Sequence, residues 1–191
     1  IMFVTVNRPS TLYFQCAPIT EVYFYDKDNS VYYERRFAQP VQEFKVNFPD
    51  TGNYTTSAPI LEYKAGPLIQ WKKIDKLPMR ERPLNPNKTV VVTDPKMPAS
   101  GTPAKIYPAR GVIHVSPAFH KLPKYQREFI LEHERGHMWY STEEFCAIYA
   151  CKRMLDRGYN ESSCVYALTR VLKRSPDNAK RIGFTFTNIV T

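Results

Sequence analysis

One stretch decides how this chain of 191 residues is interpreted: residues 123–138, PKYQREFILEHERGHM. Its apolar residues recur at the spacing of one helical face, and Pro123 suits the first turn of a helix. His133 and His137 are four residues apart, so they lie one turn apart on the same face. The stretch therefore predicts a helix running to about Met138 that presents two imidazoles side by side.

The sequence His-Glu-Arg-Gly-His at residues 133–137 predicts a zinc site. Zinc accepts imidazole nitrogens at roughly 2.0–2.1 Å in tetrahedral geometry, so His133 and His137 can share one Zn²⁺ ion. Glu134 is rotated by about 100° from His133 around the helix, which keeps it from joining them as a ligand. It can reach a water on the metal, and we therefore expect Glu134 to be the catalytic general base.

The motif and its surroundings resemble the zincin metallopeptidases, over roughly residues 89–173. Residues 111–137 are similar to the zincin edge strand, a loop and the active-site helix, and the resemblance implies a peptide substrate lying along that edge strand. Arg135 departs from the family, in which many members carry an aliphatic residue there. Gly136 matches the small residue often found there. Because glycine costs on the order of 1 kcal/mol against alanine inside a helix, we expect close packing behind the metal site.

The third metal ligand is open between two neighbouring glutamates. No third histidine follows at the metzincin spacing, and a glutamate from the next helix would resemble the gluzincins instead. We prefer Glu143, because Glu144 has capping-box spacing from Ser141; Glu144 is the alternative. The gluzincin pattern places a supporting Asp four residues after its Glu, where this chain has Ala147 or Ile148.

Two further residues are candidate donors of a hydrogen bond to a developing oxyanion. His114 lies in a predicted strand at residues 111–116 (GVIHVS), and Tyr140 follows the motif directly. The alternative for both is an ordinary surface or packing role.

The first 65 residues predict a small β-sandwich, since aromatic and β-branched residues alternate there in short runs. Asp26 to Asn29 suits a hairpin turn. The sequence D-x-G-x-Y from Asp50 to Tyr54 resembles the tyrosine corner of immunoglobulin-like domains, in which the Tyr hydroxyl bonds to backbone a few residues upstream.

The rest of the chain divides into two parts. Residues 66–110 are rich in proline and predict a linker or a wrapping segment with one strand at 89–93. Residues 111–191 predict a small, mainly helical zincin-like domain. Its second helix ends near Gly158, its third is capped by Asn160, and a short fourth begins at residues 175–176. The predicted fold class is α+β.

The composition and charge of the chain indicate its class and its compartment. Hydrophobic residues make up 43 % of the chain, no apolar run is long enough for a membrane span, and the N-terminus does not resemble a signal peptide. We expect the four cysteines to be buried thiols and the protein to be cytoplasmic or part of a virus particle. The net charge is +9, with a basic excess over residues 151–182, which we interpret as a solvated helix face in preference to a nucleic-acid site.

Two functions from different classes fit these patterns. The first, which we favour, is a zinc peptidase acting on a peptide or protein substrate. The second is a structural or assembly protein, for example of a virus particle, that retains a zincin-like domain and contacts its partners through the N-terminal β part. Neither involves a membrane.

Overall fold

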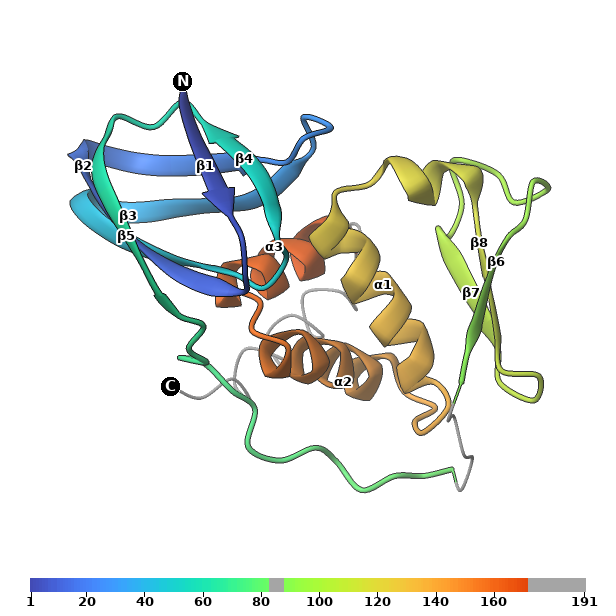
Figure 1. The fold of residues 1–191 in the computed structure, drawn as a ribbon. Coiled ribbons are helices and arrows are strands. Elements are labelled where there is room, and N and C mark those ends of the chain that lie inside the picture. Colours follow the sequence, from blue (N-terminus) through green and yellow to red (C-terminus); the bar gives the residue numbers. More distant parts are fainter. Residues whose placement is uncertain (83–87, 172–191) are drawn as a thin grey trace.

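The structure is a computed structural model that describes residues 1–82 and 88–171. Strands come first and helices last, so the predicted α+β class is confirmed (Figure 1). Two sheets and three α-helices are described, and the helices lie between the two sheets.

The N-terminal part is one antiparallel five-stranded sheet, in the order β1-β4-β2-β3 with β5 also paired to β2. The first half of β2 pairs with β3 on one side and β5 on the other, and register shifts between Gln15 and Glu21 bend it. The sheet thereby curls over its own core, so the two layers of the predicted sandwich belong to one hydrogen-bonded sheet. Its strands are β1 (Met2–Val6), β2 (Ser10–Tyr25), β3 (Val31–Phe48), β4 (Gly52–Thr56) and β5 (Ile60–Pro67).

The core of this sheet follows the predicted alternation, and its residues are mostly aromatic. The predicted turn is confirmed: the Asn29 N–H donates to the Asp26 carbonyl, and Asn29 has a left-handed φ of 60°. The tyrosine corner is also confirmed, because the Tyr54 hydroxyl donates to the Asp50 carbonyl at 2.7 Å. The inward-facing aromatic residues are Phe14, Phe24, Tyr32, Tyr33, Phe44, Phe48 and Tyr54.

The second sheet has three strands in the order β6-β8-β7. Strands β6 (Val90–Thr93) and β8 (Val112–Val115) confirm the two predicted strands, while β7 (Ala104–Tyr107) lies in the proline-rich segment and was not predicted. Because β8 is flanked on both sides, it is the central strand, and the expectation that it would be an edge strand was wrong. The edge strand that contacts α1 is β7.

The three helices pack into one core after a short 3-10 turn, η1 (Pro117–Lys121). They are α1 (Lys124–Gly136), α2 (Glu143–Asp156) and α3 (Glu161–Val171), close to the predicted bounds. Asn160 precedes α3 as expected. The predicted capping box was wrong: Thr142 is the N-cap of α2 and makes no side-chain cap bond. The predicted fourth helix lies outside the described residues.

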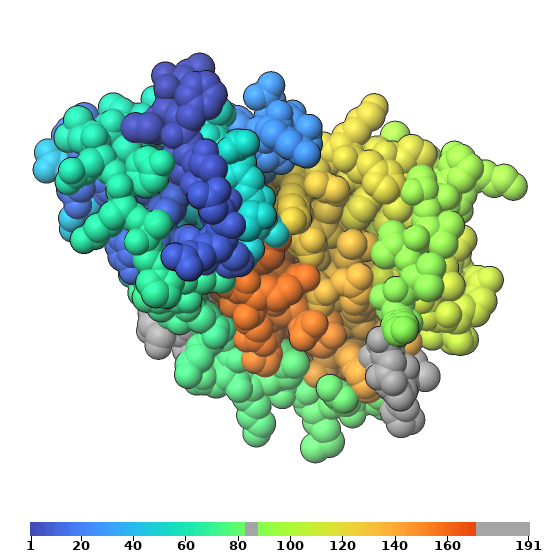
Figure 2. All heavy atoms as spheres, in the orientation of Figure 1, coloured from blue at the N-terminus to red at the C-terminus, as the bar shows by residue number. Residues whose placement is uncertain are grey.

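The proline-rich segment wraps around the helices rather than hanging free. After β5 it crosses their surface, and Ile74 is buried in the helical core (Figures 1 and 2). Residues 78–82, which we call the strap, then pass the turn between α1 and α2. Segments from the first sheet also bind the helices, since the Tyr125 hydroxyl donates to Glu34 at 2.8 Å and Asn160 exchanges hydrogen bonds with the backbone of Asn47.

The structure bears on two expectations from the composition, namely the lack of a membrane span and the burial of the cysteines. In the described ranges, no helix is both long and apolar enough to cross a membrane. All four cysteines are buried free thiols, as expected.

Candidate metal centre

Three side chains meet where α1 ends and α2 begins. His133 lies on α1, His137 is its C-cap residue, and Glu143 is the first residue of α2. The Nε2 atom of His133 is 2.6 Å from Oε2 of Glu143, and the Nε2 atom of His137 is 3.3 Å from its Oε1. The short turn between the helices therefore folds the carboxylate of Glu143 onto both imidazoles.

This donor set fits a zinc ion. Two imidazoles and one carboxylate are a common ligand set of catalytic zinc, and tetrahedral ligands at zinc distances lie about 3.3 Å apart. The potential ligand atoms of His133, His137 and Glu143 all lie within 4.8 Å of one another. Glu144 does not belong to this group, nor does any other residue in the described part of the chain. The geometry thus distinguishes between two glutamates that the sequence left open.

The charges of the three groups are coupled. Hydrogen bonds from His133 and His137 hold the pKa of Glu143 far below its usual range. Burial disfavours the charged form of His137, but the hydrogen bond to Glu143 and its negative charge outweigh this and raise the pKa of the imidazole. Without a metal, the carboxylate is therefore ionised and His137 tends to keep a proton that a metal would displace.

Glu134 lies beside this group and faces the edge strand β7. Its Oε2 accepts a hydrogen bond from the backbone N–H of Ile106 at 3.0 Å. Burial raises the pKa of the carboxyl, while His133 and His137 oppose that shift. The contact with Ile106 orients one oxygen and leaves the other available, which suits a group that transfers protons. Sequence reasoning missed this contact, because β7 has no strong strand pattern.

The groups behind the ligands differ from those of the gluzincin pattern. Ala147 and Ile148, at the two places where a supporting Asp would stand, are buried in the helical core. His137 is supported by a hydrogen bond to the backbone of Tyr140. His133 has no such support, since its Nδ1 is buried and has no hydrogen-bond partner among the described residues. Supporting partners strengthen metal sites, so His133 is the weaker anchor.

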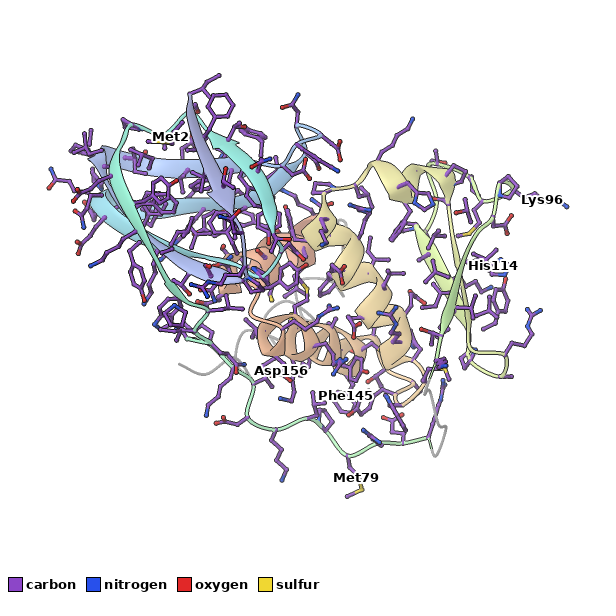
Figure 3. The ribbon with its side chains drawn as sticks, viewed as in Figure 1. Met2, Met79, Lys96, His114, Phe145 and Asp156 are labelled. Carbon is purple, nitrogen blue, oxygen red and sulfur yellow. The ribbon has the colours of Figure 1, made fainter. Side chains whose placement is uncertain are left out.

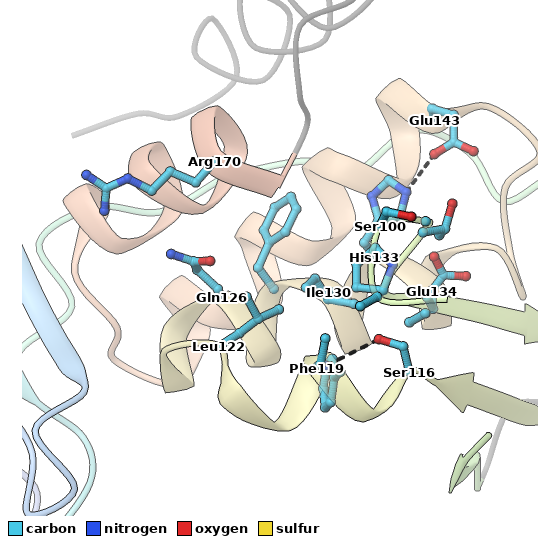
Figure 4. A pocket seen from close by; sticks show the side chains of 17 residues that line it. Ser100, Ser116, Phe119, Leu122, Gln126, Ile130, His133, Glu134, Glu143 and Arg170 are labelled. Atoms are coloured by element: carbon cyan, nitrogen blue, oxygen red, sulfur yellow. Dashed lines mark hydrogen bonds and ion pairs between the residues drawn. The ribbon is translucent and has the colours of Figure 1, made fainter. Parts of the chain in front are cut away.

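A cavity of about 560 Å³ opens next to the three ligands (Figure 4). His133, Glu134 and Glu143 form one end of it, and Ser100 from the loop before β7 lies beside His133. The loop at residues 99–104 forms much of the wall, yet its sequence carries no recognisable motif. Apolar residues from η1 and α1 form much of the remainder: Phe119, Leu122, Phe129 and Ile130.

Neither candidate oxyanion donor lines this cavity, and both occupy the surface or packing positions given as the alternative. Tyr140 is buried, with 1 % of the residue exposed. Its hydroxyl donates to the Pro78 carbonyl at 2.8 Å and thereby holds the strap. His114 lies on the outer face of its sheet, away from α1, and its Nδ1 is 3.3 Å from Asp94 (Figure 3). Residues alternate across a strand, and the inward places of β8 are taken by Ile113 and Val115.

The strap holds the turn that carries the ligands. The backbone N–H groups of Glu81 and Arg82 both donate to the Trp139 carbonyl, and the Arg82 guanidinium donates to the His137 carbonyl at 2.5 Å. The Glu81 carboxylate accepts two hydrogen bonds from Ser141, one from its N–H and one from its hydroxyl. Ser141 makes no capping box with Glu144, because Thr142 is the N-cap and Glu81 accepts the Ser141 N–H that Glu144 would accept in such a box.

Gly136 lies where the two helices approach most closely. A Cβ added there would lie 3.1 Å from the Cα of Cys146 and 3.2 Å from its Cβ. The expected close packing behind the metal site is therefore confirmed. Because Gly136 has no side chain, α2 comes near enough for Glu143 to reach the histidines.

Comparison with known proteins adds no family to this description. No protein-family model, curated protein or solved structure matches the chain. The assignment below therefore depends on the motif and its geometry.

Proposed function

We propose that the protein is a zinc-dependent peptidase. The observation that carries this proposal is the convergence of His133, His137 and Glu143, with His133, Glu134 and Glu143 lining one end of a 560 Å³ cavity. A purely structural zinc site would more often be closed by four protein ligands, whereas three ligands next to a cavity leave a position open.

The residues divide the chemistry between them. When bound, zinc would polarise the scissile carbonyl and make a water molecule easier to deprotonate. Glu134 would take a proton from that water and pass it to the leaving amine; burial raises the pKa of its carboxyl, which makes the carboxylate a stronger base for the first transfer. The Ile106 N–H holds one oxygen of Glu134 in place during the transfer. The cavity wall excludes water around the bound peptide and supplies apolar contacts to its side chains.

Zinc content tests the ligand assignment. The His133→Ala, His137→Ala double variant should lose the single zinc that the wild-type protein retains on purification. Glu143→Ala should weaken zinc retention strongly, while Glu144→Ala is the matched control and should retain wild-type zinc. Unchanged zinc in the double variant would contradict the site, and the reverse order of the two glutamates would move the third ligand to Glu144.

Peptide cleavage tests the activity. Incubation with a mixed peptide library and mass spectrometry should reveal cleavage that chelation abolishes. Glu134→Gln keeps the shape of the side chain but removes the base, so cleavage should fall by at least about a hundredfold with zinc content unchanged. Zinc-loaded wild-type protein that cleaves nothing would contradict the peptidase assignment.

Exposed apolar residues of the first sheet favour the second candidate, an assembly role. Phe3 and Leu61 are each 73 % exposed, although both belong to strands. In that case zinc would only join α1 to α2. Size-exclusion chromatography should then show a large assembly, and Glu134→Gln should assemble as the wild type does.

A further inference from the structure

A second cavity, of about 760 Å³, lies away from the metal centre, between β3, residues 71–72 and the start of α3. Four cationic side chains line it, but Glu161 is the one carboxylate among the described lining residues, and it pairs with Lys72 at 3.8 Å. The other three cations are Arg35, Arg36 and Lys45. Within the described part of the chain, Arg35 and Lys45 have no carboxylate within ion-pair distance.

Aromatic rings accompany these cations. The Lys45 ammonium lies 3.8 Å from the centre of the Trp71 ring, and the edge of Tyr13 packs against Trp71 with ring centres 6.3 Å apart. Tyr13 and Trp71 are both half-buried, so part of each ring faces solvent. Tyr166 lines the far side of the cavity.

The strand register extends this surface beyond the cavity. Tyr13 on β2 lies directly opposite Lys45 on β3 and Lys64 on β5, so the three side chains share one face of the sheet. Lys64, Tyr13 and Lys45 adjoin Trp71 on this face, and Arg35 lines the same cavity as Lys45 and Trp71. We call these five residues the basic strip.

The next row of the same sheet face limits the basic strip. Gln15 lies opposite Glu43 and Glu62, so the sign of the charge reverses one row away from Tyr13. A negatively charged ligand on the strip would be repelled from that row and directed toward the cavity. Its path is thus defined by charge on one side and by the wall of the cavity on the other.

We propose that the basic strip and its cavity bind single-stranded nucleic acid. Proteins that bind single strands combine cations that follow the phosphates with aromatic rings on which bases stack. The strip supplies both, in a sheet face and an adjoining hollow. An acidic peptide would use the cations but would gain little from Tyr13 and Trp71. The proposal is independent of the peptidase function, because none of these residues touches the metal centre.

Fluorescence anisotropy with a labelled oligothymidylate of about ten nucleotides tests the proposal on the 191-residue chain. For single strands, the logarithm of affinity falls with the logarithm of salt concentration by roughly 0.7 for each phosphate neutralised. Arg35→Ala with Lys45→Ala removes two cations, so the slope should become shallower by about 1.4. Trp71→Ala should weaken binding by about fivefold or more through lost stacking, and Trp71→Phe should restore part of it.

The matched control is Lys27→Ala with Lys96→Ala. It removes the same charge from exposed positions outside the basic strip and should leave affinity and slope close to wild type. Thermal unfolding of every variant shows which ones are folded. If Trp71→Ala is not folded, Lys64→Ala, at an exposed position of the strip, takes its place in the test. Equal losses in strip and control variants would overturn the proposal, as would no binding at all. Binding of polyglutamate in place of the oligonucleotide would overturn it in favour of an acidic protein partner.

Discussion

The core of the first sheet and the core of the helices are filled by different kinds of side chain. The core of the first sheet consists largely of stacked rings, such as Phe14 on Phe44 with centres 4.9 Å apart and Tyr32 on Phe48 at 5.6 Å. The helices α1 to α3 bury mainly aliphatic side chains and thiols, with fewer aromatic rings, and they also bury the carboxylate of Glu132.

The two regions also differ in how their buried polar groups are paired. In the first sheet, buried polar groups are paired with each other, as in the hydrogen bond from Thr11 to Asn47 at 2.7 Å. Around the metal centre, His133 keeps an unpaired buried nitrogen and three ionisable groups crowd together. Unpaired buried polar groups cost free energy, and such groups are retained where a ligand is bound. We therefore expect substitutions in the core of the sheet to change stability, and substitutions at or directly behind the metal ligands to change metal binding.

The largest effect should come from Phe24→Ala. Phe24 is fully buried and contacts four other rings, so its loss should lower the free energy of unfolding by about 3–5 kcal/mol. Denaturant unfolding followed by fluorescence would measure this. Zinc per folded molecule should stay at the wild-type value. A parallel drop in zinc would show that the sheet shapes the metal site, contrary to the comparison.

Glu132→Gln should have the next largest effect, this time in the helices. Glu132 is 2 % exposed, and its carboxylate meets Arg135 at 2.5 Å, Arg153 at 3.3 Å and Arg157 at 3.9 Å. Because the arginines are partly exposed, the loss should be limited to about 2 kcal/mol.

The matched control for Glu132 is Glu128→Gln. Among the described residues, Glu128 pairs with Arg157 alone, at 3.0 Å, and its side chain is more exposed. Its loss should lower the free energy of unfolding by less than about 1 kcal/mol in the same denaturant titration. Equal effects of the two substitutions would mean that burial of Glu132 contributes nothing.

Gly136→Ala should affect zinc more than stability. The new methyl group would press on Cys146 and displace α2 together with Glu143. The gain in helix propensity, about 1 kcal/mol, should offset much of the strain in the metal-free protein. Zinc affinity, measured by competition with a chromophoric chelator, should fall by about tenfold, a loss of about 1.4 kcal/mol. An unchanged affinity would show that α2 adjusts without moving its first residue.

Tyr54→Phe should have a small effect, because it removes only the corner hydrogen bond to Asp50, at a cost of about 1 kcal/mol. Burial raises the pKa of Tyr54 to about 12, above the value of about 10 expected for an unfolded chain. Its contribution should therefore be complete below pH 10 and be lost as the pH rises through about 12. Unfolding titrations at pH 8 and pH 11 should show the difference between wild type and variant shrinking; a constant difference would contradict it.

Local patterns predicted much of what is local in the structure. The turn at Asp26 to Asn29, the corner at Tyr54 and the helix that carries His133 and His137 each depend on residues within a few positions of one another. The alternation in β2 and β3 likewise identifies the buried face, because successive side chains of a strand point to opposite sides. Even Gly136 signalled close packing, since a glycine inside a helix needs a reason.

Contacts between distant segments were decided by the tertiary structure alone. Nothing near Ser141 indicates that Glu81, sixty residues earlier, accepts the Ser141 N–H that Glu144 would accept in a capping box. The Tyr140 hydroxyl likewise donates to the carbonyl of Pro78 in the strap, and Glu134 accepts a hydrogen bond from Ile106 on a strand that was not predicted. Helical periodicity places His133 and His137 on one face, but only the packing of α2 against α1 brings the carboxylate of Glu143, and not that of Glu144, to their nitrogens.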